Sequence, residues 1–416
     1  MKRVYGNCCG IDVHKKMIVA CFIHGKKQEI REFGTTTKEL TSLAEWLKVG
    51  QCEMVAMEST GVYWKPLYNI FEVYDIKTII VNAQHMKAVP GRKTDVKDSE
   101  WIADLLQHGL LRASYIPDKN QRELREMVQY RKSLADTHAA ELNRLQKILE
   151  GGNIKLSGTV SEIDGKSARN IIRELLLNQK IDEQRIKEMK NQKLLSSHLK
   201  ATDKELADSL EGVLSKIQIR IISEILNHLD ELEKHINNLT DDIDSSMNSD
   251  EKKAKNAIKE IPGIGDKSAD AIIAVIGTDM ERFPDASHIS SWAGVSPGNN
   301  ESAKKRRNQK TNKGNKLLKS TLVVCANSAI KCKNSFFYAQ YQRIMSRRGK
   351  KKAIMAIAHS MLIAIYHILK DKVPFRDLGA NYYNQFNRER KAFALTKKLV
   401  SLGYCVSVTA MTDPIA

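Results

Sequence analysis

Four acidic residues near the N-terminus stand where they could share a cation. Asp12 ends an apolar run typical of a buried strand, and Glu58 ends another. Asp95 and Asp98 are three residues apart where a helix is expected to begin, so both side chains can face one point. Like charges this close are costly unless cations neutralise them, and oxygen-only ligands suit Mg²⁺ or Mn²⁺. Two such ions can stabilise the attacking and leaving oxygens of a phosphodiester substitution.

Each of these acids also has an ordinary structural explanation when it is taken alone. Asp12 could close a turn with the residues that follow it, and Glu58 could cap a helix. Asp95 suits a helix N-cap, and Asp98 suits the first turn of a helix. Their order along a pattern of strands and helices is the more specific observation.

A serine is the second candidate for chemistry. Ser302 follows Glu301 and precedes a strongly basic stretch. A serine hydroxyl is a weak nucleophile until its proton is removed or its oxygen is polarised, and flanking cations can neutralise a transferring phosphoryl group. From spacing alone, Ser302 suits a solvated loop, and the basic stretch suits a solvated face. The cations expected to contact phosphates are Lys304, Lys305, Arg306, Arg307, Lys310 and Lys313.

A Pro-Gly-x-Gly turn occurs within Ile261–Gly265 and precedes an apolar run. Such a turn between two helices exposes backbone N–H groups at a helix N-terminus, and these groups can hold a phosphate without reading sequence. A helix-hairpin-helix in which Gly263, Gly265 and Lys267 contact DNA is therefore predicted. The same turn can instead simply join two packed helices.

The charge of the chain points to a polyanionic partner. Its 416 residues carry a formal net charge of +18, and 42% of them are hydrophobic, which is enough for real cores. Nucleic acid is the first candidate partner and an anionic membrane surface the second, although basicity can also be a solubility trait.

Other features of the sequence argue against a membrane or secreted protein. The longest apolar stretch, Ala353–Leu369, contains His359 and His367, and we predict a buried helix there, since a membrane span needs roughly 18 uncharged apolar residues. The N-terminus lacks a signal-peptide core. The seven cysteines form no Cys-x-x-Cys pair, which indicates neither a disulfide framework nor a zinc site. We expect the cysteines to be small core residues in a reducing cytoplasm.

The elements that must position the four acids follow an α/β pattern, which predicts a mixed sheet. Strands are expected at Val4–Val13, Met17–His24, Gln28–Phe33, Cys52–Met57 and Thr78–Val81. Helices are expected at Lys38–Val49 with Thr37 as its N-cap, at Val62–Tyr74, and from near Asp95 through Leu106.

The remainder of the chain is expected to be helical. A long helix is predicted at Arg122–Leu149. The heptad-like spacing in Ile217–Leu239 indicates that residues 151–255 form a coiled-coil-like connector. A flexible insertion at 151–210 is the alternative. Residues 256–416 are mainly helical and strongly basic, also around Arg343–Lys352. Three domains are predicted, at 1–150, 151–255 and 256–416.

Three short pieces of this sequence resemble a known family. Gly10–Lys15, Met57–Trp64 and Lys93–Asp98 look like the DEDD motifs of the insertion sequence 110 family of transposases. The N-terminal domain of that family resembles the RuvC Holliday-junction resolvase, which has an RNase H-like fold. The resemblance implies that Asp12, Glu58, Asp95 and Asp98 bind Mg²⁺ or Mn²⁺. It extends over nearly the whole chain and is weakest in residues 151–255.

The C-terminal region resembles the transposase domain of the same family. There a serine in the matching Glu-Ser position is understood to attack DNA and form a covalent link, which implies that role for Ser302. The family usually has glycine at the next position, where this chain has Ala303. Ser290, Ser291 and Ser296 are therefore the alternatives. The resemblance also implies a structured guide RNA, the bridge RNA, that pairs with donor and target DNA.

The expected fold class is α/β plus α: an RNase H-like (RuvC-like) mixed-sheet domain, a helical connector, and a mainly helical C-terminal domain. The expected function is metal-dependent cleavage and rejoining of DNA in transposition, through a serine–DNA intermediate. Expected partners are the double-stranded DNA of element ends and target, the bridge RNA, and further copies in a homodimer or homotetramer. The expected location is the cytoplasm of a bacterium or archaeon, at the nucleoid when DNA is bound.

Two other functions stay open on the sequence. A structure-specific nuclease of the Holliday-junction resolvase type would use water and would need the four acids but not Ser302. A DNA-binding architectural protein would need the basic helices but not the acids. A cleavage assay that compares Asp12→Ala with Ser302→Ala separates the three.

Overall fold

The computed structural model describes residues 3–59, 61–81, 97–297, 300–302, 305–308, 311, 313–385 and 388–409. Contacts divide the chain into two compact units, Met1–Asp118 and Lys119–Ala416. Three predicted site residues, Asp95, Lys304 and Lys310, lie outside the described residues. The predicted boundaries after residues 150 and 255 stay a prediction.

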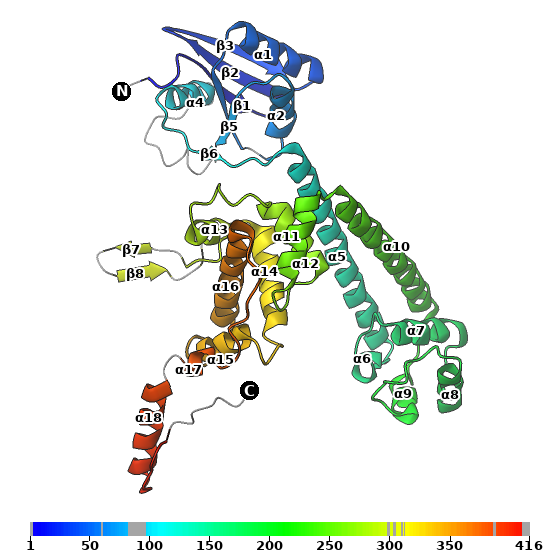
Figure 1. The fold of residues 1–416 in the computed structure, drawn as a ribbon. Coiled ribbons are helices and arrows are strands. Elements are labelled where there is room, and N and C mark those ends of the chain that lie inside the picture. The colour runs from blue at the N-terminus through cyan, green and yellow to red at the C-terminus, as the bar shows by residue number, and fades with distance from the viewer. Residues whose placement is uncertain are drawn as a thin grey trace. The chain divides into compact units, whose positions relative to one another are not determined.

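The first unit is built on one mixed sheet with the strand order β3-β2-β1-β4-β5-β6 (Figure 1). The first three strands in sequence are antiparallel neighbours, whereas β1, β4 and β5 run parallel. Parallel neighbours need crossover connections, and helices supply them here. The strands are β1 (Asn7–Val13), β2 (Met17–His24), β3 (Lys27–Gly34), β4 (Met54–Glu58), β5 (Thr78–Val81) and β6 (Ala113–Ser114).

Helices cover both faces of this sheet. Helices α1 (Thr37–Val49) and α2 (Trp64–Val73) pack on one face, and α4 (Lys97–Gln107) packs on the other. The N-cap of α1 is Thr36, whose side chain accepts a hydrogen bond from the Glu39 backbone N–H at 3.4 Å. The prediction of Thr37 as the cap was wrong, because the run of three threonines offers three caps and Thr37 is already helical.

The second unit begins with two long helices that lie side by side, α5 (Lys119–Gly151) and α10 (Lys216–Ser246). Four shorter helices lie between them in sequence and gather at one end of the pair. This group has its own core, in which Leu149, Ile171 and Ile222 are fully buried. The four helices are α6 (Leu156–Thr159), α7 (Lys166–Asn178), α8 (Glu183–Asn191) and α9 (Asp203–Ser209).

A larger core holds the remaining helices of the second unit together. The predicted buried helix at Ala353–Leu369 is confirmed within α16, which is apolar enough to cross a membrane but lies in this core. The elements are α11 (Ser249–Lys259), α12 (Asp266–Ile276), α13 (Ala286–Ala293), β7 (Asn300–Ser302), β8 (Lys305–Asn308), α14 (Lys316–Ala329), α15 (Phe336–Arg348), α16 (Lys350–Asp371), α17 (Tyr382–Gln385) and α18 (Arg388–Ser401).

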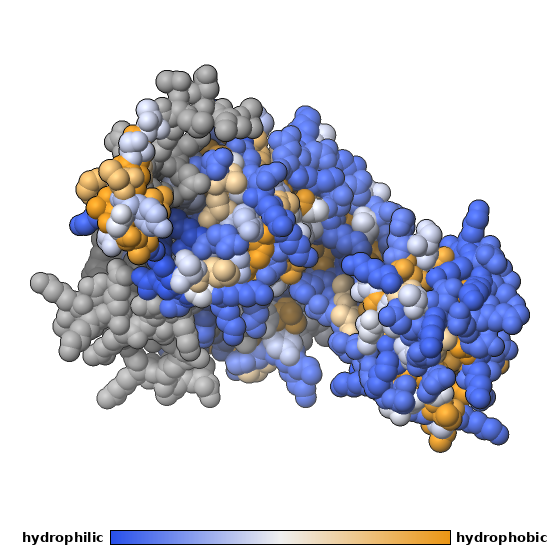
Figure 2. All heavy atoms as spheres, turned by 90° about the horizontal axis from the view of Figure 1, so that it is seen from below, coloured by the Kyte–Doolittle hydropathy of each residue, from blue (hydrophilic) through white to orange (hydrophobic). Residues whose placement is uncertain are grey.

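The mixed sheet and the mainly helical remainder confirm the predicted fold class, α/β plus α with an RNase H-like sheet. Hydrophilic side chains cover most of the face drawn in Figure 2, since the apolar ones fill the cores. The expectation that all cysteines are core residues was wrong for Cys332 and Cys405, which are exposed because they lie beyond the packed helix faces.

Candidate active site

A glycine brings helix α4 directly against strand β1. Gly10 faces α4, and a Cβ atom added to it would lie 2.2 Å from the Ala103 nitrogen and 2.4 Å from the Ser99 carbonyl oxygen. Only a residue without a side chain permits this approach. The first turn of α4, which contains Asp98, is therefore held beside the C-terminal end of β1.

Asp12 and Glu58 lie at the C-terminal ends of two adjacent parallel strands. The last paired positions of β1 and β4 are Ile11 and Met57, so Asp12 and Glu58 are the next residues along each strand. Ile11 and Met57 pack into the core beneath α1 and α2. Because successive side chains of a strand alternate between faces, Asp12 and Glu58 project toward the opposite face, the one covered by α4.

Asp12 is a largely buried carboxyl that lies within the electrostatic range of Asp98. Asp12 is only 8% exposed. Burial raises the pKa of the Asp12 carboxyl above its ordinary value, and the negative charge of Asp98 raises this pKa further. His14 partly offsets both effects, because its Nε2 lies 2.9 Å from Asp12 Oδ2. His14 was not among the predicted site residues. The only sequence signal for its contact with Asp12 is the Asp-x-His spacing at a strand end.

These residues fit the requirements of a divalent cation. Asp12, Glu58 and Asp98 offer carboxylate oxygens on one side of the sheet, and oxygen is the ligand that Mg²⁺ and Mn²⁺ prefer. The mutual repulsion of Asp12 and Asp98 is the kind that a bound cation relieves. Of the four predicted acids, Asp12 and Glu58 lie at neighbouring strand ends and Asp98 lies in the helix on the same side, and Asp95 lies outside the described residues. Among the described residues, the carboxylate oxygens of these three acids do not form a group within 4.8 Å of one another.

The predicted helix-hairpin-helix lies between α11 and α12. Gly263 has a φ of +92°, and a Cβ there would lie 2.4 Å from the Cys325 carbonyl oxygen of α14, so this glycine serves close packing. Gly265 is the N-cap of α12 and has open space around it. The Lys267 side chain is exposed in the first turn of α12. Gly265 and Lys267 are thus the accessible part of this hairpin.

Ser302 is the last residue of β7 in a short antiparallel hairpin. It pairs with Lys305, and Glu301 pairs with Arg306 across the two strands. The hairpin projects from the helices of the second unit (Figure 1). Lys305, Arg306 and Arg307 belong to β8, and Lys313, which follows, is exposed. The alternative Ser290 is fully buried within α13, where its hydroxyl donates a hydrogen bond to the Ala286 carbonyl oxygen at 2.7 Å.

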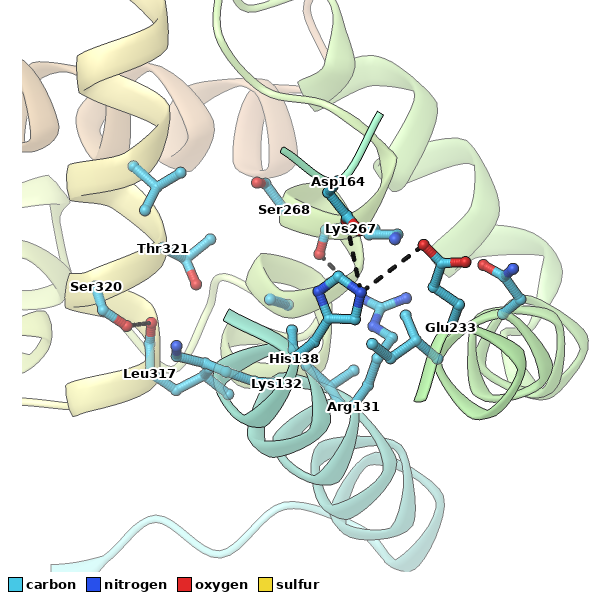
Figure 3. A pocket seen from close by; sticks show the side chains of 16 residues that line it. Arg131, Lys132, His138, Asp164, Glu233, Lys267, Ser268, Leu317, Ser320 and Thr321 are labelled. Atoms are coloured by element: carbon cyan, nitrogen blue, oxygen red, sulfur yellow. Dashed lines mark hydrogen bonds and ion pairs between the residues drawn. The ribbon is translucent and has the colours of Figure 1, made fainter. Parts of the chain in front are cut away.

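A pocket in the second unit was not predicted from the sequence. It has a volume of about 720 Å³ and is lined by side chains of α5, α10, α12 and α14 (Figure 3). Lys132, Lys267, Ser320 and Thr321 are among its polar residues. The first turn of α12, which follows the helix-hairpin-helix turn, therefore borders a hollow lined by both positive and negative side chains.

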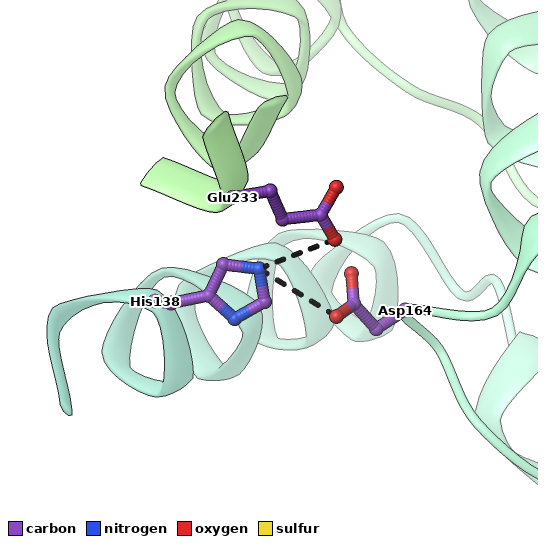
Figure 4. Close-up of side chains that lie close together, drawn as sticks. All are labelled: His138, Asp164 and Glu233. Carbon is purple, nitrogen blue, oxygen red and sulfur yellow. Dashed lines mark ion pairs between the residues drawn. The ribbon is translucent and has the colours of Figure 1, made fainter. Parts of the chain in front are cut away.

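One edge of this pocket holds His138 between two carboxylates (Figure 4). The Nε2 atom of His138 lies 3.6 Å from Asp164 Oδ2 and 3.8 Å from Glu233 Oε1. The Arg169 guanidinium lies 2.6 Å from both acids and 2.6 Å from Asp230. Within the residues that the structure describes, this is the one group of acids and histidines whose ligand atoms all lie within 4.8 Å of one another. Because Arg169 bridges its acids, we describe the cluster as a salt-bridge hub that ties α7 to α10.

Comparisons with known proteins match both units of the chain. Residues 9–154 match a transposase model of the DEDD type of IS110, and residues 255–342 match the transposase IS116/IS110/IS902 family. Together the two matches cover more than half of the chain. Asp12, Glu58, Asp95 and Asp98 fall within the first match, and Ser302 falls within the second.

One similar solved structure is that of T. thermophilus RuvC in complex with a Holliday junction substrate. It is 11% identical, covers 26% of this chain and 99% of its own, and has a TM-score of 0.20. No curated protein matches the chain.

Proposed function

The chain belongs to the IS110 family of transposases, and we propose that it cleaves and rejoins DNA through a covalent link to Ser302, with the help of divalent metal held by Asp12, Glu58, Asp95 and Asp98. The observation that supports the proposal most strongly is the placement of three of these acids on the α4 side of the sheet. Transposases of this family act on DNA, and double-stranded DNA of the element ends and target is the proposed substrate.

In this proposal the four carboxylates hold divalent metal, Mg²⁺ or Mn²⁺. When bound, the metal supplies charge neutralisation and Lewis acidity at the scissile phosphodiester. The protein's own contribution is placement, since the strand ends fix Asp12 and Glu58 while the Gly10 contact fixes Asp98. His14 holds the Asp12 carboxylate in one orientation through the 2.9 Å contact.

The proposed role of Ser302 is that of nucleophile in a transesterification. Its Oγ forms a bond to phosphorus while the bond from that phosphorus to a deoxyribose oxygen breaks. The leaving oxygen becomes a hydroxyl and gains a proton, and the serine hydroxyl loses one. The number of phosphoester bonds is unchanged, so rejoining by the reverse step needs no outside energy source.

Cations near Ser302 are proposed to hold the DNA backbone. The cations follow this serine in sequence, and they are Lys304, Lys305, Arg306, Arg307, Lys310 and Lys313. Gly265 and Lys267 offer a second backbone contact. Residues 256–416 contain 27 Lys and Arg against 11 Asp and Glu, whereas residues 119–255 contain 24 of each. The positive charge is therefore concentrated in the region that contains Ser302 and the hairpins, as phosphate binding requires.

A guide RNA and an oligomer complete the proposal. Family membership is the support for a bridge RNA, because a basic surface by itself accepts either DNA or RNA. Strand exchange between two duplexes requires at least two active sites, which favours a homodimer or homotetramer. The RNA is tested by purifying the protein from cells that contain its element: a discrete RNA encoded beside its gene should copurify, and full recombination without RNA would refute guidance.

A nuclease that activates water is the second candidate function, because the acids on the sheet do not by themselves require a serine. The experiment that separates the two compares Asp12→Ala and Ser302→Ala in a cleavage assay on element-end DNA. The transposase proposal requires both variants to be inactive. The water-using nuclease requires only the Asp12→Ala variant to be inactive.

A further inference from the structure

A long segment of the chain lacks acidic residues altogether. Residues 302–370 contain 17 Lys and Arg and no Asp or Glu. Solvated helices elsewhere in this chain pair opposite charges one turn apart, as in Lys132–Asp136 and Arg220–Glu224. A solvated face gains from such pairs, so their absence over 69 residues points to a surface that meets a polyanion.

The turn between α15 and α16 concentrates this charge at one place. Arg347 and Arg348 end α15, Lys350 and Lys351 begin α16, and Gly349 alone separates the helices. All four cations are exposed. In the part of the chain that the structure describes, none of the four forms a salt bridge. We propose that these four cations form a second binding surface for the phosphate backbone of a nucleic acid, separate from the β7–β8 hairpin.

The fold holds the turn between α15 and α16 in place. Gly349 adopts a φ of +81° and donates its backbone N–H to the Met345 carbonyl oxygen at 3.0 Å, so the chain reverses within one residue. Ala353, which follows the lysines closely, is fully buried, and its N–H donates to the Gly349 carbonyl oxygen at 3.1 Å. A surface anchored in this way loses little conformational freedom when it binds a phosphate backbone.

Two further features favour a phosphate backbone over other acidic partners. Lysines in the first turn of α16 oppose the helix dipole, an arrangement that is unfavourable without an anion nearby. A membrane surface would be met by exposed apolar side chains as well as cations. Between Val324 and Val373, where every residue is described, no large hydrophobic side chain is exposed.

The test measures how binding depends on salt. It rests on the proposed function only in taking the polyanion to be nucleic acid. The variant Arg347→Gln, Arg348→Gln, Lys350→Gln, Lys351→Gln is titrated, in the full chain, with a labelled 30-base-pair DNA duplex and with a hairpin RNA of equal phosphate number. The slope of log affinity against log salt should fall by roughly one for each phosphate that the variant no longer neutralises.

A matched control removes the same charge elsewhere. Lys180, Lys187, Lys200 and Lys204 are exposed within residues 119–255, where positive and negative charges are equal in number, and all four are changed to Gln. This control should keep the wild-type slope. A charge-conserving variant with Arg347→Lys, Arg348→Lys, Lys350→Arg and Lys351→Arg should also keep it.

The outcomes are distinct. A reduced slope with DNA alone, or with RNA alone, supports the surface and identifies the polymer that it contacts. A slope equal to that of the control with both polymers overturns the inference, even if the wild type cleaves DNA. Failure of the wild type to bind either polymer at all would instead contradict the proposed function.

Discussion

Burial raises the pKa of the Asp12 carboxyl, and the negative charge of Asp98 raises it further across the contact between α4 and β1, where Gly10 lets the helix lie against the strand. The two residues are 86 positions apart in sequence. The repulsion between the two carboxylates is unfavourable in the protein without metal. A bound cation would relieve it, and the carboxylates would then serve as ligands. The close approach of α4 to β1 is therefore the feature on which the proposed metal site depends.

Replacing Gly10 should disrupt the site without touching any acid. A Cβ atom in Gly10→Ala would overlap the backbone of α4 at 2.2 Å, so the free energy of unfolding should fall by about 1–3 kcal/mol or more. Urea denaturation measures this change. Gly158→Ala is the control, because a Cβ there meets nothing within 4 Å, and its effect should stay within about 0.5 kcal/mol. Equal stability of the two variants would contradict the close approach of α4 to β1.

Neutralising Asp98 should separate stability from activity. In Asp98→Asn the repulsion with Asp12 is removed, so the metal-free protein should be at least as stable as the wild type in thermal denaturation. Cleavage should fall by about 100-fold or more, since a divalent ion supplies several kcal/mol of charge stabilisation. Calorimetric titration with Mn²⁺ should show weakened binding.

The exposed Glu29 on β3 provides the control for this experiment. Glu29→Gln removes one negative charge from the same unit and should keep both Mn²⁺ affinity and cleavage. Full cleavage by Asp98→Asn, or by the wild type in excess chelator, would rule out a metal site that includes Asp98.

Breaking a buried charge network should strongly destabilise the second unit. Asp270 is fully buried between Arg131 and Lys255, at 2.8 Å from each. Asp270→Asn leaves two buried cations without their shared partner, so it should cost about 3–5 kcal/mol of unfolding free energy. The same substitution at the exposed Asp136, which pairs with Lys132, should cost less than about 1 kcal/mol. A similar small cost at both positions would mean that solvent reaches the Asp270 site.

The cations of β8 should bind phosphates. Changing Lys305, Arg306 and Arg307 to Gln should weaken DNA binding and reduce the log–log salt slope by roughly one for each phosphate left without its cation. Fluorescence anisotropy over a salt series measures this slope. The control changes Lys180, Lys200 and Lys204 to Gln, and a β8 variant that behaves like the control would show that β8 is only a solvated strand.

The first unit could be predicted closely from the sequence because its elements are local and strongly patterned. The bounds predicted for Met17–His24 and Thr78–Val81 are those of β2 and β5. Their apolar residues alternate or run continuously, and polar residues flank them, so a strand is the only element that fits. The convergence of Asp12 and Glu58 was expected from the strand ends and agrees with the register of β1 and β4.

Other features could not be predicted, for physical reasons. The strands β7 and β8 are short and polar, so they carry no alternation that would indicate a strand. The leucines and isoleucines of 151–210 lie at helical spacing. This spacing does not distinguish a helix of a coiled coil from the helices of a small bundle with its own core. Asp270 meets Arg131 across 139 residues, and no motif links them. Such contacts depend on how helices pack, and local sequence patterns do not reveal that packing.

The most direct test of the central claim is to trap the covalent intermediate between protein and DNA. Element-end DNA with a nick that stalls the reaction after first-strand cleavage is incubated with protein and Mg²⁺, and the products are separated under denaturing conditions. The account predicts DNA attached covalently to the protein, with peptide mapping placing the adduct on Ser302, and no adduct in Ser302→Ala although that variant still binds DNA. An adduct that persists in Ser302→Ala, or wild-type cleavage that leaves no adduct at any time, would contradict it.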